Sequence, residues 1–351
     1  MNIALYQRYS GHTEIIGSFL ELLEDIPCNI FIYYYTRDKL NWVKYYTDLF
    51  TNTNRNKTIE QNNEQNNNQN TNRNKTNEQN TNQNNIISYE SSQIIKDMMK
   101  LDLIIFLSSG DINQYWVKEY LSIKGKRIIT IPHVPKHPHP NDNISIVLTP
   151  ILKNINNGND VHYILPIYNK IPANLHENKM CILGVVGLCD ENNKDIKDLE
   201  LLIDTVDPSK FLVYIFTRGS NISRRLINKY KFSNVMVFEN IGSSEMVRKL
   251  EMCKFILPLP SKDSWYYKDR LTGVIPLAIN NNIPMVLPNK LKEIYDLKGC
   301  ISYDSSLLEI IDEVVNISED KYNHILQEMY NWKTKVCLEN KKVFNYFCLS
   351  Q

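Results

Sequence analysis

Charged and aromatic side chains gather in the segment Ser261–Arg270, which follows one apolar run and precedes another. Thr272 and Gly273 come next and open a helix-like run, so backbone N–H groups at a helix start would lie beside the cation of Arg270. Such amides, together with one or two cations, are what a phosphate or diphosphate group needs. Gly273 has no Cβ and would let the anion approach the backbone closely. The segment therefore predicts a loop that binds phosphate groups.

Other cations and two aromatic residues stand where they could serve the same ligand. Lys194 and Arg218 each follow a predicted strand, and Lys268 lies within the loop. Open parallel sheets bind their ligands at the carboxyl ends of the strands. Trp265 and Tyr266 could stack on a base or a sugar, because aromatic rings suit sites where one face stays wet. The alternatives are solvated charges for the cations and simple loop packing for the aromatics.

Two histidines are candidates for acid–base chemistry. His12 follows the first predicted strand and His133 follows the fourth. At these positions an imidazole could deprotonate a hydroxyl group. His133 belongs to the run IPHVPKHPHP, which also holds His137 and His139 and could suggest a metal site. Because its prolines impose an extended backbone, we expect no metal there.

Apolar strands alternate with helical patterns in both halves of the chain. The expected strands are 2–6, 29–35, 101–107, 127–132 and 144–148, and then 180–186, 211–216, 234–238, 255–259 and 285–287. Continuous apolar strands between helices are typical of parallel sheets covered on both faces. A long amphipathic helix is expected from about 320 to 346. The sequence thus predicts an α/β protein of two Rossmann-like domains with a cleft between them.

The expected boundaries place the N-terminal domain at 1–165, the C-terminal domain at 166–330 and a helix and tail at 331–351. Residues 51–85 interrupt the first domain and consist almost entirely of polar side chains, with the decamer TNRNKTIEQN recurring as TNRNKTNEQN. Such a segment cannot bury enough apolar surface to offset its ordering entropy. We expect a disordered insert, with a sticky interaction tract as the alternative.

Composition and missing motifs narrow the function classes. The 351 residues are 42% hydrophobic, and Lys and Arg total 40 against 39 for Asp and Glu. Without a basic surplus we expect no nucleic-acid partner, and without a run of roughly 20 apolar residues we expect no integral membrane segment. The seven scattered cysteines are typical of a reduced, cytoplasmic protein. No G-x-G-x-x-G or Walker A motif is present, which disfavours nicotinamide, flavin and P-loop enzymes.

The second half resembles the donor domain of GT-B glycosyltransferases, the group that includes glycosyltransferase family 4. Gly187 and Lys194 match the family's first glycine and lysine, and Gly219 its second glycine turn. The stretch from Asp269 to Val286 is similar to the family's E-x-F-G-x-x-x-x-E-A…G-x-P-V block. The resemblance implies a nucleotide-sugar as donor and co-substrate, with no further cofactor and no metal. The implied donor-site residues are Lys194, Arg218, Lys268, Asp269, Arg270, Thr272 and Gly273.

The sequence departs from this family at a residue that matters. When the block is aligned on Pro284, the family's first glutamate falls on Asp269 and its second, which holds the donor ribose, falls on Leu277. Two hypotheses follow. The chain is a glycosyltransferase that moves a sugar from a nucleotide-sugar to an unknown acceptor, or it is a GT-B-like protein without catalysis that binds sugars or serves in an assembly.

Overall fold

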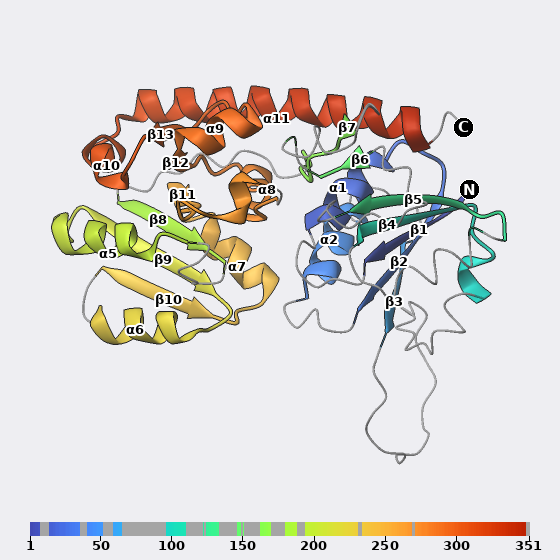
Figure 1. The fold of residues 1–351 in the computed structure, drawn as a ribbon, viewed down its shortest axis with the longest axis horizontal. Helices are drawn as coiled ribbons and strands as arrows, with labels where there is room; N and C mark the ends of the chain where they lie inside the picture. The colour runs from blue at the N-terminus through green and yellow to red at the C-terminus, as the bar shows by residue number, and fades with distance from the viewer. Residues whose placement is uncertain are drawn as a thin grey trace, which may run out of the picture.

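The computed structural model describes residues 1–7, 14–35, 41–51, 59–64, 96–109, 122, 124–132, 146–148, 150, 162–169, 180–187, 194–230, 234–268 and 271–348. These residues form two main parallel sheets that lie side by side (Figure 1). The long helix α11 (Glu319–Cys348) runs along both of them. It matches the helix expected from about 320 to 346.

The first sheet has the strand order of a Rossmann domain. Its described strands run in the order β3-β2-β1-β4-β5, and all neighbouring pairs are parallel. This is the order 3-2-1-4-5 of dinucleotide-binding domains. The elements are β1 (Asn2–Gln7), α1 (Glu14–Leu22), β2 (Asn29–Tyr35), α2 (Trp42–Thr51), β3 (Ile59–Glu64), β4 (Leu103–Ser109) and β5 (Arg127–Pro132).

The central strand β1 explains why this sheet is covered on both faces. Ile3 and Leu5 belong to one hydrophobic cluster, while Ala4 and Tyr6 belong to another. Successive side chains of a strand point to opposite faces, so the uninterrupted apolar and aromatic run from Ile3 to Tyr6 must be buried on both.

The edge strand β3 differs from what the sequence predicts, because it lies within the segment 51–85 expected to be disordered. Its sequence IEQNNE pairs in parallel with β2, from Ile30–Ile59 to Tyr35–Glu64. Pairing at a sheet edge uses backbone N–H and C=O groups that every such residue carries, so it does not require apolar side chains. These six residues are thus paired within the segment expected to be disordered, and the remainder of the segment after Thr51 lies outside the described residues.

The second sheet repeats the Rossmann order. Strands β10-β9-β8-β11 are parallel, and a bridge between Ile256 and Met285 continues the sheet to the parallel pair β12-β13. Its strands are β8 (Cys181–Val186), β9 (Phe211–Thr217), β10 (Val235–Glu239), β11 (Phe255–Leu257), β12 (Val286–Pro288) and β13 (Ile301–Tyr303). In chain order this is again 3-2-1-4-5-6. The expectation of two Rossmann-like units is confirmed.

Short helices follow most of these strands. They are α5 (Ile196–Thr205), α6 (Asn221–Lys229), α7 (Ser243–Leu250), α8 (Val274–Asn280), α9 (Asn289–Tyr295) and α10 (Ile311–Val315), with the 3₁₀ turns η2 (Trp265–Tyr267) and η3 (Leu307–Glu309). The small parallel pair β6 (Ile146–Val147) and β7 (His162–Tyr163) lies before the second sheet in the sequence. The carboxyl ends of both main sheets point toward the middle of the molecule (Figure 1).

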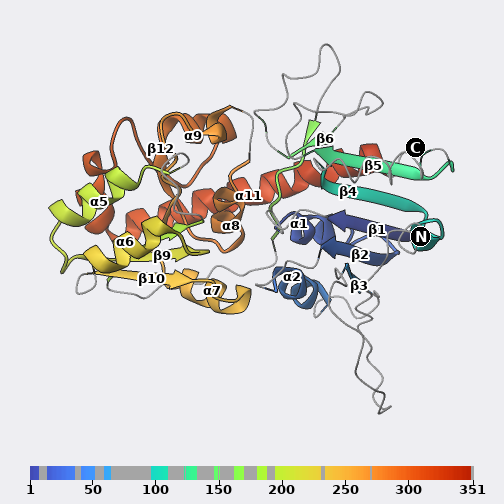
Figure 2. The same cartoon turned by 60° about the horizontal axis from the view of Figure 1, so that its bottom comes forward.

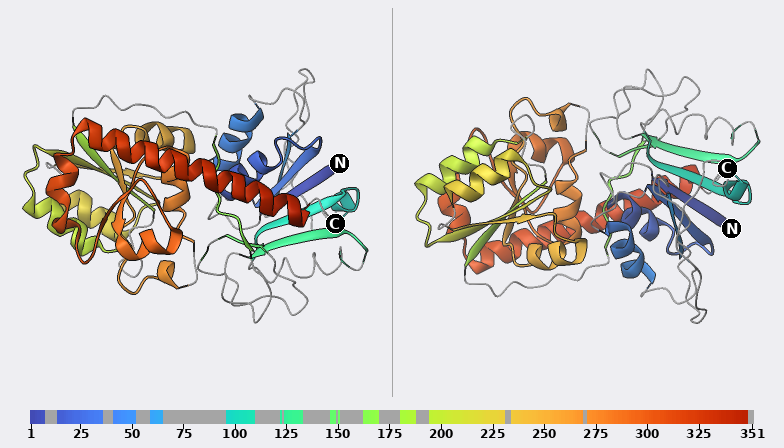
Figure 3. Two further views of the ribbon diagram at one scale, coloured as in Figure 1. Left: turned by 90° about the horizontal axis from the view of Figure 1, so that it is seen from above. Right: turned by 90° about the horizontal axis from the view of Figure 1, so that it is seen from below.

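Two asparagines hold the segment 162–169, which connects the two halves. Asn340 of α11 accepts a hydrogen bond from Leu165 N at 3.2 Å and donates one to Leu165 O at 2.7 Å. Asn280 of α8 accepts from Tyr168 N at 2.9 Å and donates to Pro166 O at 3.2 Å. Figures 2 and 3 show α11 passing from the second sheet to α1 of the first. The connection is therefore bonded to elements beside it rather than left as a free linker.

A fully buried lysine supports this junction. Lys333 on α11 is 0% exposed, and its Nζ donates to Asn280 O at 3.3 Å and to Asn282 Oδ1 at 2.9 Å. Burial lowers the pKa of Lys333 from its usual 10.5 to about 8. Burial also raises the pKa of the nearby Glu21 carboxyl, whose Oε2 accepts from Asn169 N.

The buried lysine makes stability depend on pH. Between about pH 8 and pH 10.5 the unfolded chain holds a proton on Lys333 that the folded chain has lost. The folded state is therefore stabilised as pH rises through this window, by up to roughly 3 kcal/mol. In urea unfolding, we expect the wild type to gain stability relative to Lys333→Met from pH 8 to pH 10. A pH-independent difference between the two proteins would contradict this.

Gly299 allows α11 to pack directly on the chain before β13. Its φ is +65°, and a Cβ there would clash with Met329 N and Ile325 O of α11. Gly299→Ala should lower the free energy of unfolding by about 3 kcal/mol or more, because neither backbone atom can move alone. Gly242→Ala is the control, since a Cβ at Gly242 meets nothing within 4 Å. Equal urea midpoints for the two variants would refute the role of Gly299.

Candidate functional site

In the second sheet the chain adds strands outward from β8 in one direction (β9, β10) and then from β8 in the other (β11). Open α/β sheets bind ligands at such a switch point, beside the carboxyl ends of the strands. Gly187 ends β8 with φ +107°, in the left-handed region that favours glycine, and its N–H donates to Phe216 O at 2.9 Å. Pro258 comes directly after β11. The carboxyl ends of β8, β9 and β11 thus form one edge.

Lys194 lies across this edge. The side chain is only 5% exposed, and its Nζ donates to Pro258 O at 2.9 Å. A Cβ on Gly187 would stand 3.5 Å from Lys194 Cε, so the lysine passes over the end of β8. The backbone is held there too, by an antiparallel bridge to Pro260 and by Asp195 N donating to Leu259 O at 2.9 Å. A buried ammonium group is thereby positioned between two strand ends.

The end of β9 adds a cation and a buried hydroxyl group. Arg218 is exposed, directly after the strand, as the sequence predicts. Thr217 is 8% exposed, and no described residue offers its Oγ1 a hydrogen-bond partner. The following Gly219 has φ +84° and lies near the carboxylate of Glu239 at the end of β10. Sequence reasoning missed Thr217, although its position before an Arg-Gly turn at a strand end is a usable signal.

The aromatic side chains of the loop after β11 differ in how exposed they are to solvent. Ser264 is buried and accepts from Tyr266 N at 3.3 Å, which starts η2. Trp265 is 45% exposed, with Lys268 Nζ 5.5 Å from its ring centroid. Tyr267 is half-buried under Lys290, whose Nζ is 4.5 Å from the ring, and burial raises the pKa of Tyr267 to about 12. Trp265 is therefore the more exposed of the two rings, while Tyr267 serves packing.

The start of α8 differs from the starts of α5 and α6. Those two helices have side-chain caps, Asp195 accepting from Asp198 N and Ser220 accepting from Ser223 N. At α8 the N-cap is Gly273, which has no side chain to accept a hydrogen bond, and Thr272 beside it is 3% exposed. The sequence expectation of a helix start at Thr272 and Gly273 is met in geometry.

Four predicted site residues lie outside the described residues: His12, His133, Asp269 and Arg270. Their roles remain predictions. Leu277, at the position of the family's ribose-binding glutamate, is half-buried and packs against the larger core cluster.

Within the described part of the chain, no three His, Cys, Asp or Glu side chains are grouped so that they could hold a metal ion. None of the described helices is long and apolar enough to span a bilayer.

Sequence comparisons find no matching family model and no matching curated protein. Solved structures do match along the whole chain. A glycosyltransferase from Rickettsia africae has a TM-score of 0.63 at 13% identity, covering 100% of this chain and 99% of its own. HepE of Anabaena, solved with UDP, gives 0.59 at 8% identity with both chains covered completely. UDP-GlcNAc 2-epimerase from Neisseria meningitidis, bound to UDP-GlcNAc, gives 0.52 at 11% identity, covering 97% and 99%.

Together with the two Rossmann-ordered sheets, these matches show that the chain has a divergent GT-B fold. The resemblance inferred from the sequence of the second half is confirmed at the level of fold. Since transferases and an epimerase share this architecture, the fold does not by itself choose the reaction.

The unpaired hydroxyl of Thr217 leads to a stability prediction. A buried hydroxyl without a partner is unfavourable, so Thr217→Val should leave the free energy of unfolding unchanged or raise it by about 1 kcal/mol. Thr47→Val is the matched control, because Thr47 Oγ1 donates to Val43 O and Lys44 O in α2. Its loss should cost about 1 kcal/mol. Urea unfolding of both variants checks this, and destabilisation of Thr217→Val equal to the control would contradict it.

Proposed function

We propose that this chain is a glycosyltransferase that takes a sugar from a nucleotide-sugar donor bound at the carboxyl edge of the second sheet. The observation that carries the proposal is Lys194, a buried ammonium group held across the ends of β8 and β11 at the point where the strand order reverses. Structural neighbours with the same fold are glycosyltransferases, and one of them was solved with UDP.

In this proposal the donor diphosphate lies between Lys194 and the start of α8. The backbone at Thr272 and Gly273 contributes the partial positive charge of a helix start that has no side-chain cap. Arg218, directly after β9, is the proposed second cation at this edge, and Arg270, two residues before Thr272 in the sequence, is proposed as a third. Developing negative charge on the leaving diphosphate would be stabilised by these groups, which is how such sites lower a barrier.

The exposed ring of Trp265 is the proposed platform for the base or the sugar, with Lys268 beside it. Asp269, the next residue in the sequence, is proposed to contact the same donor. The acceptor, whose identity stays open, would approach from the first sheet, where His12 and His133 are the proposed proton acceptors for its hydroxyl group.

Leu277 favours a second candidate, a GT-B-like protein without catalysis that binds sugars or serves in an assembly. A half-buried leucine packed on the core cannot accept the hydrogen bonds of a ribose. Either the ribose is held by another group, or the donor is no longer processed.

A thermal-shift screen with UDP, GDP, ADP, CMP and their sugars tests the donor site. A ligand at about a hundred times its Kd should stabilise the protein by roughly 2.7 kcal/mol. Lys194→Met should weaken binding by about tenfold or more, because a charged hydrogen bond to phosphate is lost. Lys197→Met, at an exposed lysine of α5 three residues after Lys194, is the matched control and should bind as the wild type does.

The outcomes separate the candidates. No shift with any nucleotide, from a protein that is folded by circular dichroism, would overturn the donor site. Binding that is lost in Lys194→Met, together with slow release of free sugar from the donor in water, supports the transferase. Binding without any release of sugar favours the protein without catalysis, and conversion of the bound sugar to its epimer would replace transfer by epimerisation.

A further inference from the structure

An open surface pocket lies at the opposite edge of the second sheet, beside the amino ends of β9 and β10. Its volume is about 490 Å³, enough to admit a small organic molecule. The lining comes from the end of α5 with the turn into β9, from the end of α6, and from the residue before β10: Ile203, Asp204, Thr205, Val206, Asp207, Pro208, Lys229, Tyr230 and Asn234. It shares no lining residue with the candidate donor site.

We propose that this pocket binds a small organic ammonium ion, and the geometry of its polar groups points to this class. The site is independent of the proposed transferase activity, because it depends only on residues at the amino edge of the sheet.

Two helix ends set the potential of the pocket. Helix α5 ends at Thr205 and helix α6 at Lys229, so both present their carboxyl ends here. The last carbonyl groups of a helix have no partner within it and carry a partial negative charge that favours cations. Two such ends meeting at one pocket make it rich in hydrogen-bond acceptors.

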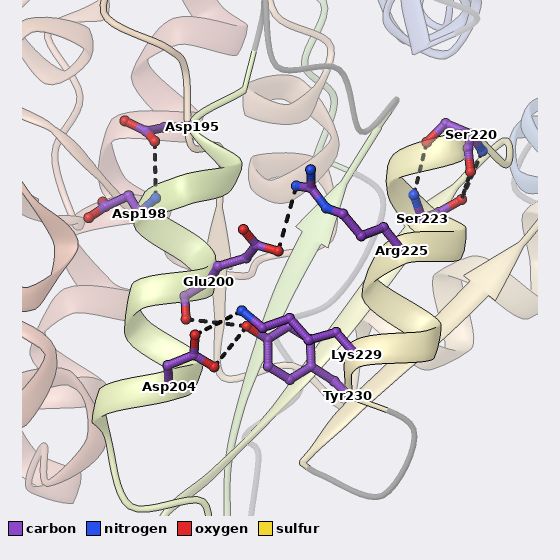
Figure 4. A network of polar contacts seen from close by, with 9 residues as sticks. All are labelled: Asp195, Asp198, Glu200, Asp204, Ser220, Ser223, Arg225, Lys229 and Tyr230. Carbon is purple, nitrogen blue, oxygen red and sulfur yellow. Dashed lines mark hydrogen bonds and ion pairs between the residues drawn. The ribbon is translucent and has the colours of Figure 1, made fainter.

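The charged side chains also make the pocket negative. Lys229 Nζ lies 2.8 Å from Asp204 Oδ2, and Tyr230 OH donates to Asp204 Oδ1 at 2.9 Å, a group that Figure 4 shows between α5 and α6. Hydrogen bonds from Lys229 lower the pKa of Asp204, and those from Ser209 lower the pKa of Asp207. Both carboxylates are thus charged at neutral pH, and only one lysine stands among the lining residues to balance them.

Asn234 contributes a buried acceptor. It is 7% exposed, and its Nδ2 donates to Phe211 O at 3.1 Å, which orients the amide. No described residue donates to its Oδ1. This oxygen is closed off from solvent, so it adds a partial negative charge behind the pocket wall rather than a direct contact to the ligand.

An ammonium group meets these requirements together, because it carries three donors and a positive charge and accepts no hydrogen bonds. The apolar parts of Ile203, Val206 and Pro208 would contact the carbon chain of the ligand. A phosphate or carboxylate would instead face two helix carboxyl ends and two carboxylates.

The test is a titration of the full chain at pH 7.5 with 1,4-diaminobutane, which is a dication there, and with 1,4-butanediol, its neutral analogue of equal length. Backbone amide shifts of ¹⁵N-labelled protein report the location. We expect the diamine to shift the amides of residues 203–207 in a saturable way and the diol to leave them unchanged. Asp207→Asn should weaken diamine binding about fivefold, because the ion pair between the Asp207 carboxylate and the ammonium group would be exposed to solvent and therefore modest in strength.

The control is Asp48→Asn, the same change at an exposed carboxylate of α2 beside Lys44. It should bind the diamine as the wild type does. Equal binding of diamine and diol, equal weakening by the two substitutions, or no saturable shift at 20 mM diamine (roughly the limit of weak specific binding) would each overturn the proposal.

Discussion

The arrangement of this molecule depends on the bonds that two asparagine side chains make to the connecting segment 162–169. Asn280 and Asn340 each use both polar atoms of the amide on backbone groups of that segment, so they replace the pairing that a strand would supply. The buried Lys333 in turn holds the carbonyl of Asn280. These bonds join α8, α11 and the connection to one another between the two sheets, whose carboxyl ends point toward each other (Figure 1).

Energetically unfavourable polar groups of the second sheet lie at the edge that faces the first sheet. A buried ammonium group and a hydroxyl with no partner among the described residues lie at this carboxyl edge, at Lys194 and Thr217. Both are costly in a simple core, and local rules are expected to be broken at functional sites. The amino edge has its own unpaired group in Asn234. Both edges depart from ideal packing, while the strands between them are apolar and regular.

Much of the fold could be predicted because continuous apolar strands between amphipathic helices leave few arrangements open. The strand expected at 29–35 and the helix expected from about 320 to 346 appear with nearly those bounds. The polar strand β3 could not be predicted, since its pairing with β2 uses the backbone and leaves no pattern in the side chains. Of the site, the loop at Trp265 and the start of α8 could be placed, because turns and glycines mark them locally.

The sequence by itself determined the two α/β units, the cations at strand ends and the leucine where the GT-B family that it resembles has glutamate. Only the tertiary structure decided that Lys194 is buried against Pro258, that Tyr267 packs while Trp265 stays exposed, and that no described residue donates to Asn234 Oδ1. The physical reason is that side-chain pattern specifies which face of an element is buried. Burial and hydrogen bonding of one polar atom depend on neighbours that are distant in the chain, and these neighbours exist only once the sheets have formed.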